Sequence, residues 1–95
     1  MTQETYSFIQ SELSKLPHQF TFGGRNREEA YERGVLACKS ILSDCFKRNN
    51  MQDFAPRTTL KMSPNKRYRY AEDYRKGVRD GVALVYRYLY PDLPR

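Results

Sequence analysis

The chain has 95 residues, of which 39% are hydrophobic and 29% are charged. This length and composition are typical of a single globular domain and argue against a disordered or multidomain protein. No apolar run approaches the roughly 20 residues that a transmembrane helix needs. The N-terminus also lacks a basic region followed by an apolar core, which a secretory signal would have. We therefore expect one cytoplasmic domain over residues 1–95, with no membrane association.

Positive charge is concentrated in the second half of the chain. Residues 1–47 contain six basic and six acidic residues, whereas residues 48–95 contain eleven basic and five acidic residues. The whole net charge of +6 therefore belongs to the second half. Such a concentration favours an anionic partner, which is nucleic acid, a phosphorylated small molecule or an acidic protein surface.

Apolar spacing predicts three helices. The first spans about residues 4–16, where side chains recur every three or four positions and Pro17 ends the helix. The second spans about residues 26–48, with Asn26 as its N-cap and acidic residues in its first turn. A connection over residues 49–63 follows, and the third helix spans about residues 64–90. The predicted fold class is mainly α.

An α+β fold is the alternative. Residues 20–22 alternate phenylalanine with threonine, and residues 58–62, TTLKM, are the one regular stretch of an otherwise irregular connection. These two segments would pair as a small two-stranded β element.

A seven-residue motif occurs twice in the chain. EAYERGV at residues 29–35 returns as EDYRKGV at residues 72–78, and nearly every match falls on a predicted inner face. Glycine inside a helix costs about 1 kcal/mol relative to alanine, so its presence indicates that two helix backbones approach closely. We therefore expect the second and third helices to form a pseudo-repeated antiparallel hairpin that crosses at Gly34, Cys38, Gly77 and Gly81.

Two alternatives to this packing remain open. Each copy of the motif could bind a ligand instead of the other copy. The glycine groove is also self-complementary, so it could close a homodimer, and we expect a homo-oligomer.

The outer face of the last helix carries the residues that the core does not need. At 100° per residue a stripe of tyrosine and arginine side chains points outward, with further basic residues beside it. The members of this predicted interface are Arg75, Arg79, Arg87, Lys76, Arg69, Lys66, Arg67, Tyr68, Tyr86 and Tyr90. Arg79 and Arg87 have no acidic residue three or four positions away, so they are the uncompensated charges.

Three interpretations of this stripe stay open. Arginine binds phosphates while tyrosine stacks on bases, which favours nucleic acid or a complex that contains it. The same residue types dominate protein interfaces, which favours an inhibitor or adaptor of the compact kind that mobile elements encode, acting on an acidic partner surface. A solvated basic face without a partner is the third interpretation.

A possible anion site lies at the start of the second helix. Arg25 and Arg27 follow a glycine pair, and exposed amide groups at a helix N-terminus attract phosphate. A small phosphorylated ligand could be held there between subunits, although Glu28 and Glu29 occupy the same turn and an ordinary turn is the simpler interpretation.

No residue pattern indicates catalysis, a metal ion or a cofactor. The only histidine, His18, has no nucleophile or carboxylate arrangement near it in sequence. Cys38 and Cys45 are seven positions apart in a predicted helix, which is too far for a disulfide between them. We expect both to be reduced thiols and the chain to act by binding.

Overall fold

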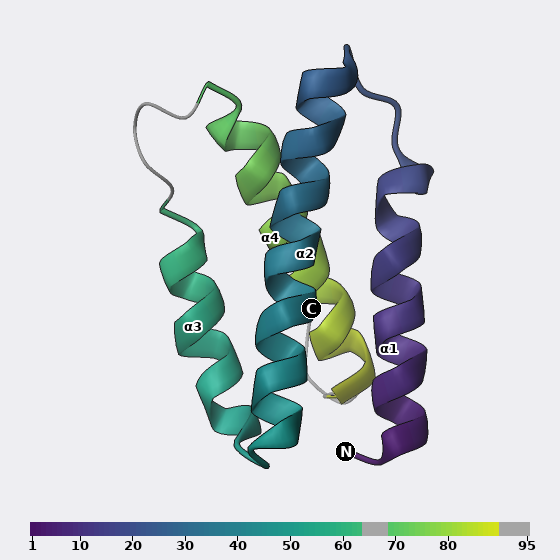
Figure 1. Cartoon of the computed structure of the whole chain (residues 1–95), viewed down its shortest axis with the longest axis vertical. Coiled ribbons are helices and arrows are strands. Elements are labelled where there is room, and N and C mark those ends of the chain that lie inside the picture. Colours follow the sequence, from purple (N-terminus) through teal and green to yellow (C-terminus); the bar gives the residue numbers. More distant parts are fainter. Residues whose placement is uncertain (64–68, 90–95) are drawn as a thin grey trace.

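A computed structural model describes residues 1–63 and 69–89 of the chain (Figure 1). The described residues form four α-helices, which are α1 (Gln3–Lys15), α2 (Arg25–Lys47), α3 (Phe54–Lys61) and α4 (Ala71–Leu89). Short 3-10 turns follow α1 at Leu16–Gln19 and precede α3 at Met51–Asp53. The mainly α class is therefore confirmed. The β alternative is not supported, because no described residue lies in a strand and residues 58–61 belong to α3.

The first helix is capped by its own sequence and docks on the end of α2. Thr2 accepts a hydrogen bond from the Thr5 backbone at 3.1 Å, which satisfies one of the free amide groups of the first turn. Tyr6 stacks on Phe46 with ring centres 4.2 Å apart. Because Phe46 lies at the end of α2, this contact sets α1 antiparallel to α2, and Figure 1 shows the pair side by side.

The connection that was expected to be irregular contains α3. Pro56 falls in the first turn, where its missing N–H would have no partner within the helix anyway. The Thr58 hydroxyl donates to the Phe54 carbonyl oxygen at 2.9 Å, so this buried polar group has a hydrogen-bond partner within α3. Phe54 is buried against the core and Tyr86 of α4. This single aromatic anchor holds the short helix in place.

Helix α3 makes α2 and α4 run parallel, whereas the sequence predicted that these two helices would be antiparallel. Both helices begin at the top of Figure 1 and run downward, while α3 carries the chain back up. A Cβ atom placed on Gly34 would lie 3.0 Å from the Gly77 Cα atom, and one placed on Gly81 would lie 3.0 Å from the Cys38 Cβ atom. These contacts advance in the same direction on both helices, so α2 and α4 are parallel. The antiparallel hairpin was wrong because the connection is a returning helix and not a turn.

The backbones of α2 and α4 meet at glycine. A Cβ atom on Gly34 would overlap the Tyr74 carbonyl oxygen, and one on Gly77 would overlap the Tyr31 carbonyl oxygen. Both positions therefore require the absence of a side chain. The Cys38 thiol donates to the Val78 carbonyl oxygen at 3.2 Å one turn further along. The close approach that these glycines allow is used within one chain.

In the part of the chain that the structure describes, none of the helices has both the length and the apolar character needed to cross a membrane.

Candidate functional site

Helix α3 covers part of the stripe of α4 that was predicted to point outward. Arg75 donates from Nε to the Met62 carbonyl oxygen at 2.9 Å and also pairs with Glu72. Tyr86 packs on Phe54 with ring centres 6.2 Å apart. Both side chains were expected to point to solvent, and both instead lie at the border with α3. The sequence prediction placed them outward because it had no third helix to cover that side.

Two further basic residues of the predicted interface have partners within the chain. Lys76 donates to Asp80 at 3.1 Å, and its Nζ atom lies 4.6 Å from the ring centre of Phe20. The guanidinium carbon of Arg69 lies 5.7 Å from the ring centre of Tyr70. Asp80 compensates the charge of Lys76, whereas the ring contact leaves the charge of the exposed Arg69 in place.

Arg79 and Arg87 have no counter-ion among residues 1–63 and 69–89. Both are exposed, and neither forms a hydrogen bond or an ion pair with any other described residue. They are eight positions apart on α4, which corresponds to about 12 Å along the helix. Ala83 lies between them and is also exposed. We call Arg79, Ala83 and Arg87 the arginine strip.

The remaining predicted contacts lie outside the described residues, and they are Lys66, Arg67, Tyr68 and Tyr90.

Both arginines of the possible anion site form ion pairs. Arg25 pairs with Glu29 at 3.2 Å. Arg27 donates from two of its nitrogen atoms to Asp73, which is 9% exposed, and this hydrogen bonding raises the pKa of Arg27. The open depression beside Arg25 is lined by three glutamates. This end of α2 therefore carries little free positive charge, and Arg27 joins α2 to α4.

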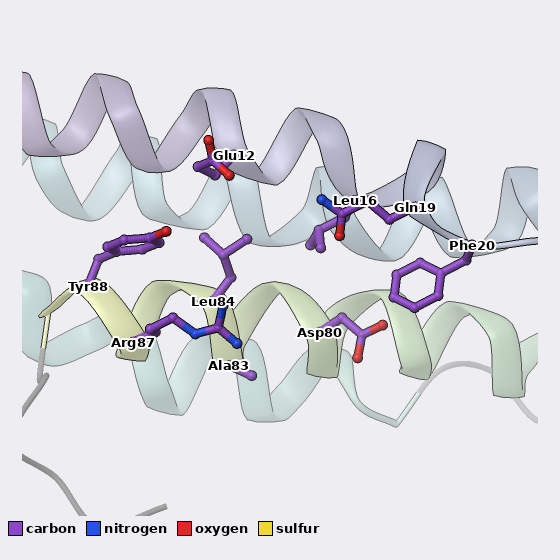
Figure 2. A pocket seen from close by; sticks show the side chains of 9 residues that line it. All are labelled: Glu12, Leu16, Gln19, Phe20, Asp80, Ala83, Leu84, Arg87 and Tyr88. Carbon is purple, nitrogen blue, oxygen red and sulfur yellow. The ribbon is translucent and has the colours of Figure 1, made fainter.

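A groove lies between α1 and α4 beside the arginine strip. Its volume is about 240 Å³, and its lining comes from the two helices and the turn after α1: Glu12, Leu16, Gln19, Phe20, Asp80, Ala83, Leu84, Arg87 and Tyr88. Figure 2 shows Tyr88 at one end and Phe20 at the other, with Arg87 along the α4 side. Ala83 and Arg87 thus belong to the groove as well as to the strip.

Aromatic rings at the groove are exposed. Tyr88 is 37% exposed, Phe20 is 38% exposed, and Phe8 is 48% exposed beside Tyr88. The Phe8 and Tyr88 rings meet edge to face with their centres 5.1 Å apart. The sequence prediction missed this group, because it placed neither Tyr88 nor Phe8 in the predicted interface. The available signal was that Phe8 lies off the apolar stripe of α1.

The charges inside the groove are compensated with one exception. Glu12 pairs with Lys15 at 3.1 Å. Asp80 accepts hydrogen bonds from the Tyr31 hydroxyl at 2.8 Å and from Lys76 at 3.1 Å. Among the described residues that line the groove, Arg87 is the charged side chain without a counter-ion.

Tyr31 is the buried member of the hydrogen-bonded group that also contains Asp80 and Lys76. Its side chain is fully buried, while its hydroxyl reaches Asp80. Burial raises the pKa of Tyr31 well above its ordinary value of 10.0, and the hydrogen bond to the Asp80 carboxylate and the charge of that group raise it further. The folded protein therefore holds Tyr31 neutral at a pH where the unfolded chain releases the proton.

This difference makes stability depend on pH under alkaline conditions. The contribution of neutral Tyr31 is complete below pH 10.0 and is lost as the pH rises above it, because only the unfolded state loses the proton. We expect the free energy of unfolding to fall by about 1.4 kcal/mol per pH unit in that range from this group alone. Urea unfolding at several pH values should show that Tyr31→Phe removes this part of the slope. An equal slope in the variant would contradict the assignment.

The other reactive side chains show no arrangement for chemistry. Cys38 and Cys45 are buried free thiols, and burial raises the pKa of Cys38 to about 12, so its thiol stays protonated at neutral pH. Within residues 1–63 and 69–89, no group of three histidine, cysteine, aspartate or glutamate side chains could hold a metal ion.

Comparisons with protein-family models, with curated protein sequences and with solved structures find no significant match to this chain.

Proposed function

We propose that the chain is a non-enzymatic binding protein that occupies nucleic acid, or a complex containing it, through the arginine strip. The observation that carries this proposal is that Arg79 and Arg87 are exposed without a counter-ion in the described structure, while Lys76 and Arg75 on the same helix are paired. Guanidinium groups bind phosphate oxygens in a bidentate manner and stay charged at any physiological pH. A rigid helix that presents two of them is suited to a phosphate backbone.

The repeated motif supports a single binding surface, because its two copies serve the packing of α2 on α4. Gly34 and Gly77 take part in the same backbone contact, each facing the carbonyl of a repeated tyrosine on the other helix. We infer that the motif recurs because the two helices pack on each other, and that a single binding surface lies on α4.

The salt dependence of binding tests the proposed contact. Replacing both arginines, Arg79→Gln with Arg87→Gln, should weaken binding to a labelled oligonucleotide at low salt. The slope of the logarithm of affinity against the logarithm of salt concentration should become shallower by about 1.5 to 2, because two phosphate contacts no longer release counterions. Fluorescence anisotropy over a salt series measures both quantities.

A matched control separates the strip from net charge. Arg33 and Lys47 are exposed on α2 and form no ion pair with the described residues, so Arg33→Gln with Lys47→Gln removes the same charge elsewhere. This variant should retain the slope of the unchanged protein to within a few tenths. Equal losses in the two double variants would mean that only the overall charge matters, and the arginine strip would then not be the site.

The second candidate is a protein partner with an acidic surface. It is favoured by Tyr88 and Phe8 beside Arg87, because tyrosine and arginine dominate the energetics of protein interfaces. A chain of this kind would act as an inhibitor or adaptor and would form a stoichiometric complex without a dependence on phosphate. Failure to bind any oligonucleotide at low salt would favour this candidate.

The remaining hypotheses gain less from the structure. A phosphorylated ligand at Arg25 and Arg27 would have to compete with Glu29 and Asp73 for both guanidinium groups. Self-association stays a prediction, and the mass of the free protein in sedimentation equilibrium tests it.

A further inference from the structure

The groove between α1 and α4 has exposed aromatic rings at both ends. Phe8 and Tyr88 lie together at one end, and Phe20 lies at the other end. Each ring keeps between 37% and 48% of its surface exposed, although large apolar side chains are usually covered when packing allows it. Among the nearby residues, Leu84 and Leu16 are buried. Among the large apolar side chains at the groove, the aromatic ones are therefore those that stay exposed.

Exposed rings of this kind distinguish unpaired bases from paired ones. In a duplex the faces of the bases are covered by their neighbours, so a side-chain ring beside the backbone has no face to stack on. In a single strand the faces are accessible, and each base stacked on an aromatic side chain adds roughly 5-fold to 100-fold in affinity. Stacking is also tolerant of base identity, because every base has such a face.

Arg87 connects these rings to the phosphate contact. It lies next to Tyr88 in sequence, lines the groove and also forms one end of the arginine strip. A strand whose phosphates follow the strip would thus bring its bases toward the aromatic rings beside the same arginine. The carboxylates of Glu12 and Asp80 are neutralised by Lys15 and Lys76, so they do not repel that strand as free charges.

We infer that the chain prefers single-stranded over double-stranded nucleic acid, with bases stacking at Tyr88 and Phe8 while Arg87 and Arg79 bind the phosphates. The inference rests on the proposed function and adds the class of nucleic acid. The Gln19 amide, which is exposed in the turn after α1, offers a donor and an acceptor to the edge of a base in the groove.

The test compares strands of the same sequence. Labelled oligonucleotides are titrated as a single strand and as its duplex, with the unchanged protein, Tyr88→Leu and Tyr88→Phe. The unchanged protein should bind the single strand more tightly. Tyr88→Leu should lose roughly 5-fold to 100-fold of affinity for the single strand and little for the duplex, while Tyr88→Phe should bind like the unchanged protein because it keeps a ring.

A second variant and a control variant ensure that the conclusion does not depend on Tyr88 alone. Phe8→Leu should lower single-strand affinity in the same direction. Leu36→Ala changes a residue on α2 that is 49% exposed and outside the groove, and it should leave binding unaltered. Circular dichroism of each variant checks that the helices are intact.

The possible results separate this inference from the proposed function. Equal affinity for both forms, or an equal loss on both forms in Tyr88→Leu, overturns the inference and leaves the arginine strip as a general phosphate contact. A higher affinity for the duplex also overturns it. Absence of binding to either form at low salt overturns the inference and the proposed function together.

Discussion

Gly77→Ala should lower the free energy of unfolding by about 2 to 3 kcal/mol, although alanine is the better helix former by about 1 kcal/mol. The new methyl group would overlap the Tyr31 carbonyl oxygen and approach the Gly34 backbone at 3.1 Å. Backbone atoms cannot move aside as the end of a flexible side chain can, so α2 and α4 must separate. Urea unfolding followed by circular dichroism measures the change.

The control for this substitution is an exposed position on α2. Ser40→Ala adds no atom at the helix contact, and its unfolding free energy should stay within about 0.5 kcal/mol of the unchanged protein. Gly34→Ala should behave like Gly77→Ala, because its methyl group would meet the Tyr74 carbonyl oxygen. A stable Gly77→Ala protein would show that the two backbones are further apart than described here.

Phe54→Ala should destabilise the protein by about 3 to 5 kcal/mol and lower its melting temperature by more than about 10 °C. Phe54 is 1% exposed, and its removal leaves a cavity between α3, the core and Tyr86. Because α3 is short, no other large apolar side chain of this helix replaces the anchor. Thermal unfolding by differential scanning calorimetry gives the shift.

The same helix supplies the comparison. Leu60 is 76% exposed, so Leu60→Ala should change the free energy of unfolding by less than about 0.5 kcal/mol. Similar melting temperatures for the two variants would contradict the docking of α3 by Phe54. They would also remove the reason why Arg75 and Tyr86 lie at a helix border.

Local pattern was enough to predict that the long helices exist, but not where each begins. The third helix was expected from about residue 64, whereas α4 begins at Ala71 after a turn at residues 69–70, and the expected N-cap Asn26 lies inside α2. The apolar spacing around Ile9 and Leu13 gave α1, and Pro17 marked the 3-10 turn that follows it. On α4 the repeated Gly77 and Val78, which were expected on the inner face, are buried. These elements are long and amphipathic, so their periodicity is a strong signal.

The short helix could not be predicted in the same way. Phe54–Lys61 has only two turns and contains Pro56 and two threonines, so its propensity is low. Its stability comes from the burial of Phe54 against residues that are distant in sequence. The direction of α4 depends on this helix. The missed α3 and the wrong antiparallel arrangement of α2 and α4 therefore have one cause.

The failure to predict α3 also limited the prediction of the site. Charge pairing along one helix distinguished Arg79 and Arg87 from the paired Arg75 and Lys76, because the rule for positions three and four apart needs no tertiary structure. That Arg79 and Arg87 bind a partner stays a prediction. Arg75 and Tyr86 were misplaced, and Tyr88 was missed, because their surroundings come from α3 and α1. A groove formed by two helices leaves no pattern in either one.

Mapping the contact by nuclear magnetic resonance tests the central claim most directly. A single-stranded oligonucleotide is added to the isotope-labelled protein at low salt, and the shifts of the backbone amides are followed. The proposed site predicts that the largest shifts lie at residues 79–89 of α4 and around Phe8 and Gln19. Shifts confined to α2 and α3, or no shifts at all, would contradict the arginine strip as the binding surface.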